Sequence, residues 1–407
     1  MKTVNEAVVI GGGPVGSFTA LNLYKRGVPT TVFEEHAEIG VPSHCAGHLS
    51  IQSLSNLGLY PLPNRIIENE FSAANFHSTA GTTFSVRLKH PITCALNREL
   101  FDKHLAEKAQ AAGAEYRLRS RVSSLVSENG FIKGVNVERH DTTESMFAKV
   151  VVDAEGISSN LLRGAGLPIL NAKKLVYAVE AEVDNIKNAD PDAVEVFIGK
   201  TYAPGFYAWI IPRKDGSAKV GLGARSGNPK ELLQKLRSEH PIASRMLSRS
   251  NITRMAFHAI TLGGPIPKAF ADGFLAIGDA ASQVKPTTGG GVIFGLTCAQ
   301  LAAETISEAI NRENVSAQFL QQYQARCNDK TGFDFRVMMR ARRFLDTLTD
   351  ERIDDILRTC NRLGLGEALS DVQEIDFQGK LLLQLLAKPA AAAALVYLLL
   401  LYLSANP

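Results

Sequence analysis

The chain has 407 residues, of which 45% are hydrophobic and 21% charged, and these proportions are those of a globular protein with more than one domain. A net charge of +3, without a dense run of lysine and arginine, argues against a nucleic-acid partner. The five cysteines show no C-x-x-C spacing, which disfavours a disulfide framework and a metal site and suits a reducing compartment. The N-terminus leads directly into a predicted strand without the pattern of a signal peptide, so we expect a cytoplasmic protein.

The first part of the chain has the pattern of one βαβ unit. An apolar run, Ala7–Ile10, precedes Gly11-x-Gly13-x-x-Gly16; a helical stretch follows, and Thr30–Phe33 reads as a second strand. Gly11 permits a tight turn, Gly13 lets the backbone approach a pyrophosphate, and Gly16 lets the helix pack on the sheet. We predict a dinucleotide site, and the alternative is a glycine-rich turn without a ligand.

Glu34 follows this second strand, where a carboxylate can accept hydrogen bonds from an adenosine ribose. Further along, the pattern predicts a helix at Arg98–Ala112 and a hairpin around Asn129-Gly130. An apolar strand at Lys149–Val152 then ends at Asp153.

From about residue 175 to 224 the pattern changes to recurring strands, which predict an antiparallel sheet with one face able to cover a ligand. They lie at Val176–Val183, Val194–Gly199, Phe206–Pro212 and Lys219–Gly223. Residues 263–267 read as a linker back to the first domain, and they precede a buried strand at Phe274–Ile277 and a long helix from about Gly291 to Ile310. The chain from Ala317 onward reads as helical.

These elements predict an α/β fold, α+β overall, with a Rossmann-like dinucleotide-binding domain, an antiparallel-sheet substrate domain and a helical C-terminal region. The expected boundaries are 1–170 plus 265–315 for the first domain, 171–264 for the second and 316–407 for the third. Residues 66–92 are an alternative part of the substrate domain.

The choice of FAD depends on the segment Gly273-Phe-Leu-Ala-Ile-Gly278-Asp279-Ala-Ala281. Here the chain resembles the FAD-binding flavoproteins that include p-hydroxybenzoate hydroxylase and the geranylgeranyl reductases. The resemblance implies that Asp279 accepts hydrogen bonds from the ribityl chain of a non-covalent FAD, and it gives Asp153-x-x-Gly156 a place beside the cofactor. The alternatives are that Asp153 caps a helix and that Asp279 only forms a turn.

The loop Pro286-Thr-Thr-Gly289-Gly290-Gly291 precedes the long helix. Three glycines let backbone amides come close to a ring system, and the positive end of the helix faces whatever lies there. If that is the flavin, this end favours its reduced, hydride-donating form. The alternative is a loop with a glycine cap.

The segment Ala203–Pro212 resembles the YxWxFP signature of geranylgeranyl reductases, with Ile211 where phenylalanine is usual. It also resembles the WxWxIP signature of flavin-dependent halogenases, with Tyr207 in place of the first tryptophan. Tyr207 and Trp209 are therefore candidate catalytic aromatics, and the alternative is that they belong to the core.

The segment Gly40–Gly47 resembles the part of the reductases that carries C-x-G beside the flavin, here Cys45-Ala46-Gly47. Cys45 is the candidate proton donor, although a lone cysteine is usually a small buried hydrophobe. Arg98 matches an arginine that contacts FAD in this family, and a surface arginine is the alternative. The resemblance extends the FAD site to Pro14, Val15, Glu35, Ala46, Gly47, Val122, Gly278, Pro286 and Val292.

The resemblance implies a reductase that saturates the double bonds of geranylgeranyl chains in isoprenoid lipids, with NADPH or ferredoxin as reductant. A flavin monooxygenase or halogenase is the first alternative, and a non-catalytic flavin- and lipid-binding protein is the second. The uncharged stretch Ala390–Leu403 is too short to span a membrane, which takes about 20 residues. It predicts either a buried helix or peripheral contact with the cytoplasmic face of a membrane, where Arg336, Arg340 and Arg343 could meet anionic head groups.

Overall fold

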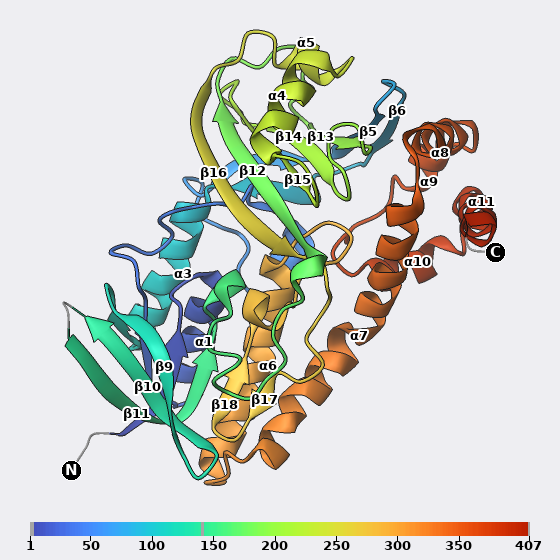
Figure 1. Ribbon diagram of the computed structural model, residues 1–407. Coiled ribbons are helices and arrows are strands. Elements are labelled where there is room, and N and C mark those ends of the chain that lie inside the picture. Colours follow the sequence, from blue (N-terminus) through green and yellow to red (C-terminus); the bar gives the residue numbers. More distant parts are fainter. Residues whose placement is uncertain (1–3, 140–141, 406–407) are drawn as a thin grey trace. The chain divides into compact units, whose positions relative to one another are not determined.

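The computed structural model of the chain describes residues 4–139 and 142–405, with side chains as far as Tyr397. It divides into two compact units (Figure 1). The first unit comprises Met1–Ser43, Arg98–Lys174 and Thr261–Phe335; the second comprises His44–Asn97, Leu175–Ile260 and Arg336–Pro407. The chain therefore passes between the units five times, and residues 66–92 lie in the second. Assigning cofactor binding to the first unit and substrate binding to the second remains a proposal.

The first unit is built on an eight-stranded sheet whose central strands run parallel in the order β18-β11-β1-β2-β8. These strands are β1 (Val4–Ile10), β2 (Thr30–Phe33), β8 (Glu115–Arg117), β11 (Thr142–Asp153) and β18 (Phe274–Ala276). The strands β9 (Arg121–Glu128), β10 (Phe131–Arg139) and β17 (Phe270–Ala271) complete the sheet. The second half of β1, Ala7–Ile10, is apolar and buried on both faces, as a central parallel strand requires.

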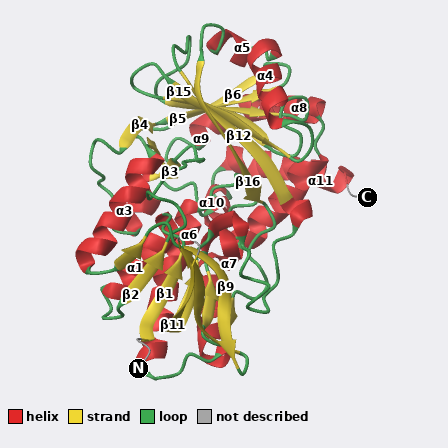
Figure 2. Cartoon of the chain, turned by 60° about the vertical axis from the view of Figure 1, so that its left-hand side comes forward, coloured by secondary structure: helices red, strands yellow, loops and turns green. Residues whose placement is uncertain are grey.

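The main helices of the first unit are α1 (Pro14–Tyr24), α3 (Arg98–Ala112) and α6 (Val292–Asn311), and α1 packs against the other two. Figure 2 shows these helices beside the sheet. Short 3-10 turns lie at Gly156–Ser158, Ala172–Lys174 and Gly278–Ala281. The predicted Rossmann-like arrangement is confirmed, including the helix at Arg98–Ala112 and the hairpin at Asn129-Gly130.

The second unit contains a seven-stranded sheet in the order β16-β12-β15-β14-β13-β5-β6. Its strands are β5 (Ala73–Ser78), β6 (Thr83–Arg87), β12 (Leu175–Val183), β13 (Ala193–Ile198), β14 (Tyr207–Pro212), β15 (Ala218–Ala224) and β16 (Ile252–Thr261). The four strands β12 to β15 were predicted and pair antiparallel, but β5, β6 and β16 were not predicted, and β5 pairs parallel with β13. A three-stranded sheet, β3 (His48–Ser50), β7 (Thr93–Leu96) and β4 (Ile67–Phe71), and helix α2 (Ile51–Asn56) also belong here.

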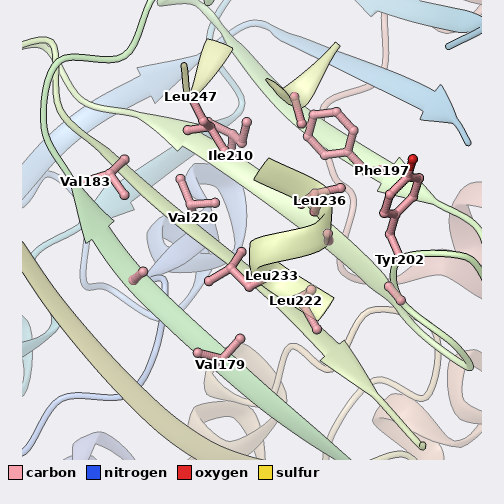
Figure 3. Close-up of a cluster of buried hydrophobic side chains, with 14 of the residues drawn as sticks. Val179, Val183, Phe197, Tyr202, Ile210, Val220, Leu222, Leu233, Leu236 and Leu247 are labelled. Carbon is pink, nitrogen blue, oxygen red and sulfur yellow. The ribbon is translucent and has the colours of Figure 1, made fainter. Parts of the chain in front are cut away.

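The two faces of the larger sheet carry different residues. On one face Val220 and Leu222 of β15 pack in the core with Leu233 and Leu236 of α4 (Pro229–Glu239) and with residues of α5 (Ala243–Met246) (Figure 3). The other face carries the alternate residues of β15, which are Lys219, Gly221 and Gly223. This second face is the one relevant to the candidate site.

The C-terminal region is helical, as predicted. It contains α7 (Ala317–Thr347), α8 (Asp350–Arg362), α9 (Leu365–Ala368), α10 (Gln378–Leu385) and α11 (Pro389–Ala405). Among the described residues no single helix combines the length and apolarity needed to cross a membrane, although α10 and the start of α11, bent by 114°, pass that test as a pair.

Candidate functional site

Four neighbouring parallel strands of the first unit end in one row. Phe33, Ile10, Asp153 and Ala276 are paired in register across β2, β1, β11 and β18. The loops that leave these strands contain the glycine motif, Glu34, Gly156 and the Gly278-Asp279 pair. Ligands of open α/β sheets bind outside the carboxyl ends of the strands, so four predicted segments far apart in sequence meet where a dinucleotide would bind.

The glycines of this loop differ in whether the fold leaves room for a side chain. Gly11 has a φ of +94°, and a Cβ atom on it would lie 2.4 Å from the carbonyl oxygen of Ala154. On Gly13, by contrast, a Cβ atom would meet nothing within 4 Å. Gly13 is the N-cap of α1, whose first N–H groups lack partners within the helix. Open space above a helix N-terminus is the arrangement that binds a pyrophosphate.

Val15 fixes the start of α1 against the rest of the unit. Two neighbouring glycines face it, since a Cβ on Gly278 would lie 3.1 Å from Val15 and one on Gly295 of α6 only 2.6 Å away. The first motif and the Gly278-Asp279 motif are therefore in direct contact. Val15 has a packing role besides any contact with a cofactor.

Glu34 is held by the glycine loop itself. Its carboxylate accepts hydrogen bonds from Gly12 N at 2.8 Å and His36 N at 2.9 Å, and it is 2.6 Å from His36 Nδ1. A carboxylate has about four acceptor positions, so it can still accept bonds from a ribose. Glu35 is more exposed and lies 3.8 Å from Arg121, one residue before Val122 on β9.

Three carboxylates of the first unit lie in surroundings that disfavour their charge. Burial, and then the negative charge of Glu155, raise the pKa of Asp153, whose Oδ2 has no hydrogen-bond partner among the described residues. Burial also raises the pKa of Asp279 and of Asp102, and the positive charge of Arg98 partly offsets both effects. Arg98 binds Asp102 at 3.0 Å through both carboxylate oxygens.

The loop before α6 folds back on itself. Lys285 N donates to Gly290 O at 3.2 Å and Gly289 N donates to Lys285 O at 2.8 Å. Gly291 is the N-cap of α6, and a Cβ on it would lie 2.6 Å from the Asp279 carboxylate. Pro286 and Val292 flank these glycines. Lys285, a buried cation beside Gly290, was not predicted, because nothing in its sequence context distinguishes it from a surface lysine.

These observations fit FAD. The open space at Gly13, the acceptors Glu34 and Asp279, and the buried Asp153 oxygen without a partner are the features a bound dinucleotide would use. In the part of the chain that the structure describes, no group of three or more histidine, cysteine or carboxylate side chains could hold a metal ion.

The remaining predicted residues lie together in the second unit. Cys45 is half-buried, unlike the other four cysteines, and its Sγ accepts a hydrogen bond from Gly47 N at 3.4 Å. Burial, and then the charge of a Cys45 thiolate, raise the pKa of Tyr207, so this phenol and this thiol are close enough to interact. The structure thus brings two of the three candidate catalytic residues together.

Trp209 lies over the neighbouring strand β15, close to Tyr207. Its ring centroid is 5.7 Å from that of Tyr207, and a Cβ on Gly221 would lie 2.5 Å from the indole. Phe206 covers Gly223 in the same way. The two glycines of β15 therefore make room for the aromatic residues, a role that their positions in the sequence did not reveal. Trp209 Nε1 is buried without a hydrogen-bond partner among the described residues.

Comparison with known proteins identifies the family to which this chain is similar. The FAD binding domain family matches residues 5–331. A curated relative, digeranylgeranylglycerophospholipid reductase 2 of Methanopyrus kandleri, is 31% identical over 363 residues, which are 88% of this chain and 90% of that protein.

Solved structures agree with this comparison. A geranylgeranyl bacteriochlorophyll reductase-like protein of Thermoplasma acidophilum superposes with a TM-score of 0.86 and 26% identity, over 98% of this chain and all of that one. A flavin-dependent brominase superposes with a TM-score of 0.72 over 91% of this chain and 95% of its own, but at 20% identity it shares the fold alone.

Proposed function

This chain belongs to the FAD binding domain family and, within it, to the digeranylgeranylglycerophospholipid reductases, and from this premise we propose its reaction. It saturates carbon–carbon double bonds of geranylgeranyl chains in isoprenoid lipids, with FAD as its resident cofactor. The observation that carries the proposal is the pair of sites described above. One is a dinucleotide cradle at the strand ends of the first unit, and the other is an aromatic face with a half-exposed thiol in the second.

The first unit holds the cofactor. We assign the diphosphate to Gly11, Gly13 and the N-terminus of α1, the adenosine to Glu34 with Glu35 and Val122, and the ribityl chain to Asp279. Arg98, Gly156 and the 286–292 loop complete this proposed site. Reduced FAD, when bound, supplies the hydride that the saturation of an alkene requires.

The second unit supplies the proton and the apolar surface. An isolated alkene accepts hydride poorly, so protonation at the less substituted carbon would leave positive charge on the more substituted one. The faces of Tyr207 and Trp209 stabilise such a charge through their ring quadrupoles. Because its pKa is raised, Tyr207 stays an uncharged phenol, and we assign the proton to Cys45 Sγ or to a water that it holds.

The two alternative functions differ in whether they use molecular oxygen as a substrate. A monooxygenase or halogenase consumes oxygen at its reduced flavin. The fold that this chain shares with the brominase is compatible with this alternative. A non-catalytic flavin- and lipid-binding protein would turn over neither oxygen nor an alkene.

One experiment separates the three. The purified protein is reduced with dithionite under anaerobic conditions, a geranylgeranyl lipid is added, and flavin absorbance and lipid mass are followed. We expect flavin reoxidation together with lipid products two mass units heavier per saturated bond. Flavin that is reoxidised only after oxygen is admitted, with unchanged lipid, would reject the reductase. An oxygenated or halogenated product would then identify the first alternative, and its absence the second. Replacing dithionite with NADPH or with reduced ferredoxin then identifies the physiological electron donor.

We also propose peripheral contact with a membrane, made by α10 and α11. Leu383, Leu386 and Val396 are more than half exposed, whereas Ala391 and Ala394 of α11 are buried against the chain. An exposed apolar patch of this kind marks an interaction surface, and the proposed substrate resides in a bilayer. Arg336, Arg340 and Arg343 are exposed, and their spacing places them on one face of α7, where they would meet anionic head groups.

A further inference from the structure

Lys219 is a buried cation on the face of the second unit's sheet that carries Trp209. In the strand register it lies opposite Ile211 of β14 and Glu182 of β12, and its side chain is 4% exposed. Burying an ammonium group costs several kcal/mol unless it is paired and hydrogen-bonded. An unpaired lysine at this position would therefore destabilise the folded protein, and the contacts of its ammonium group offset that cost.

The Lys219 ammonium group donates hydrogen bonds to two backbone carbonyls and forms an ion pair with Glu68. Nζ lies 2.8 Å from the carbonyl oxygen of Leu96, 3.1 Å from that of Ala46 and 2.7 Å from Glu68 Oε2. One side chain thus joins β15 to the end of β7, to the 45–47 segment and to β4. These four parts of the second unit are far apart in sequence.

A β-bulge turns Glu68 toward this lysine. In the pairing of β4 with β7, Ile67 is opposite Leu96 and Asn69 is opposite Ala95, so Glu68 is the extra residue. Bulges redirect side chains and recur beside functional sites. Glu68 also binds Arg213 at 3.1 Å, and Arg213 binds Glu182 at 2.9 Å, which completes a network of alternating charges.

The segment that Lys219 holds is the one that carries the thiol. Gly47 O accepts a hydrogen bond from Leu96 N at 2.9 Å, and the preceding carbonyl, Ala46 O, is bound by Lys219. Two successive carbonyls are therefore fixed, and the amide between them donates to Cys45 Sγ. Gly47 has a φ of +71°, so the chain turns sharply at this point. The direction of the thiol depends on the peptide that Lys219 anchors.

We infer that Lys219 is a positioning residue, which acts through the carbonyl of Ala46 to aim the Cys45 thiol at the substrate. The inference rests on the proposed function, in which Cys45 delivers or orients the proton. Lys219 itself does not touch the reacting atoms in this assignment. Loss of the Lys219 ammonium group should therefore change the reactivity of the Cys45 thiol while FAD binding stays the same.

The test uses two variants of the full-length holoprotein. Lys219→Met removes the donors and keeps the length of the side chain, and Lys219→Met combined with Glu68→Gln also removes the carboxylate that would lose its partner. The matched control is Val220→Ala, which removes buried apolar volume from the opposite face of the same strand. The first readout is the rate of iodoacetamide alkylation at Cys45, followed by peptide mass spectrometry; the other four cysteines are buried and serve as internal references.

We expect both Lys219 variants to change the alkylation rate of Cys45 roughly tenfold, because two hydrogen bonds from a charged donor are lost. FAD content should stay at the wild-type level, and kcat for alkene reduction should fall while KM changes little. The Val220→Ala control should be less stable but should alkylate Cys45 at the wild-type rate.

Wild-type alkylation and wild-type kcat in the double variant would overturn the inference, and so would the same changes in Val220→Ala. If Lys219→Met does not fold, the double variant decides. If that also fails to fold, Glu68→Gln alone must change the alkylation rate of Cys45 relative to wild type, and an unchanged rate rejects the inference. A wild-type protein that reduces no alkene would defeat the proposed function, whereas the alkylation experiment would still judge the contact between Lys219 and the Cys45 segment.

Discussion

A Cβ atom on Gly16 would lie 1.9 Å from the carbonyl oxygen of Gly11. No side chain fits there without displacing the backbone, so Gly16 is required by the fold whether or not a cofactor is present. Gly13, three residues earlier, would tolerate a side chain in the absence of FAD. The two glycines of one motif can therefore be used to separate folding from cofactor binding.

Gly13→Val should lower FAD content to a small fraction of the wild-type level and leave the melting temperature of the apoprotein within a few degrees. The added methyl groups occupy the open space assigned to the pyrophosphate. Absorbance at the flavin band and thermal denaturation measure both effects. Gly16→Ala is the matched control and should lower the yield of folded protein itself. Full FAD occupancy in Gly13→Val would show that the pyrophosphate does not bind at this loop.

Asp279→Asn should weaken FAD binding by roughly tenfold to a hundredfold, which corresponds to the loss of about 1.5–3 kcal/mol for a hydrogen bond to a charged group. The amide keeps the size of the carboxylate beside Gly291 but has a single acceptor oxygen. Fluorescence titration of the apoprotein with FAD measures the change. An unchanged dissociation constant would show that Asp279 has only the structural role of a turn residue.

The apoprotein should become less stable as pH rises through the titration range of Asp153. Its pKa is raised in the folded state, so the folded protein binds more protons than the unfolded one between the ordinary aspartate pKa near 4 and the raised value. Stability therefore decreases with rising pH across that range. Glu155, whose pKa burial also raises, adds a slope of the same sign; Glu35 opposes its ionisation further and Arg121 favours it.

Asp153→Asn should remove the Asp153 part of this slope and keep the acceptor for Glu155 N, which now donates to Asp153 Oδ1 at 3.0 Å. Melting temperatures of both apoproteins at pH 5 and pH 8 provide the measurement. The difference in melting temperature between the variant and the wild type should shift in favour of the variant at the higher pH. Parallel pH profiles would mean that Asp153 keeps an ordinary pKa.

Most of the first unit could be predicted because its signals are local. Each of the strands ending at Ile10, Phe33 and Ala276 ends in apolar residues, which glycine or an acidic residue follows directly or after one further residue. Such patterns follow from burial on both faces and do not depend on distant partners. The packing of Val15 against Gly278 and Gly295 could not be predicted, since these glycines are distant in sequence and meet it only after the sheet has formed.

Cys45→Ser should keep FAD and slow alkene-dependent flavin reoxidation by roughly a hundredfold to ten-thousandfold, the range that a positioned proton donor contributes. A hydroxyl is nearly isosteric with the thiol but is a weaker acid. Stopped-flow absorbance under anaerobic conditions measures the rate. Cys94→Ser is the control, because this thiol is buried and burial, with Glu70, raises its pKa to about 12. Equal rates for Cys45→Ser and wild type would return Cys45 to the role of a packing residue.

Replacing Leu383, Leu386 and Val396 with glutamine should weaken co-sedimentation with anionic liposomes at least roughly tenfold, because partial burial of each apolar side chain contributes about 1 kcal/mol. Activity on lipid in vesicles should fall more than activity on a short, detergent-dispersed prenyl substrate. Tyr177→Gln, at an exposed apolar position of the same unit, serves as a control for surface substitution. Unchanged co-sedimentation would reject this patch as the membrane contact.

Truncation after Lys388 provides a second test of the same surface. It removes α11, whose Ala391 and Ala394 are buried, so loss of folding would indicate that the helix belongs to the core. A folded truncation that loses activity equally on both substrates would also contradict the interfacial role.

The second unit was harder to predict because its contacts are distant in sequence. Strand β5 pairs parallel with β13, more than a hundred residues away, and β16 has several exposed positions that obscure its periodicity. Lys219 could be recognised only as a strand residue, since its partners Ala46, Glu68 and Leu96 come from other parts of the chain. A β-bulge such as the one at Glu68 leaves no clear signal in the sequence.

The five crossings between the units have a consequence for synthesis on the ribosome. Strand β11 ends at Asp153, and its parallel neighbour β18 begins at Phe274, so 120 residues must be translated before that edge of the sheet can be covered. At about 5–20 residues per second the delay is roughly 6 to 24 seconds. During this time the nascent chain presents an apolar strand with unpaired backbone groups, a surface that binds chaperones or other nascent chains. The arrangement that brings together the loops proposed to bind FAD thus exposes the growing polypeptide to misassembly until most of it has been made.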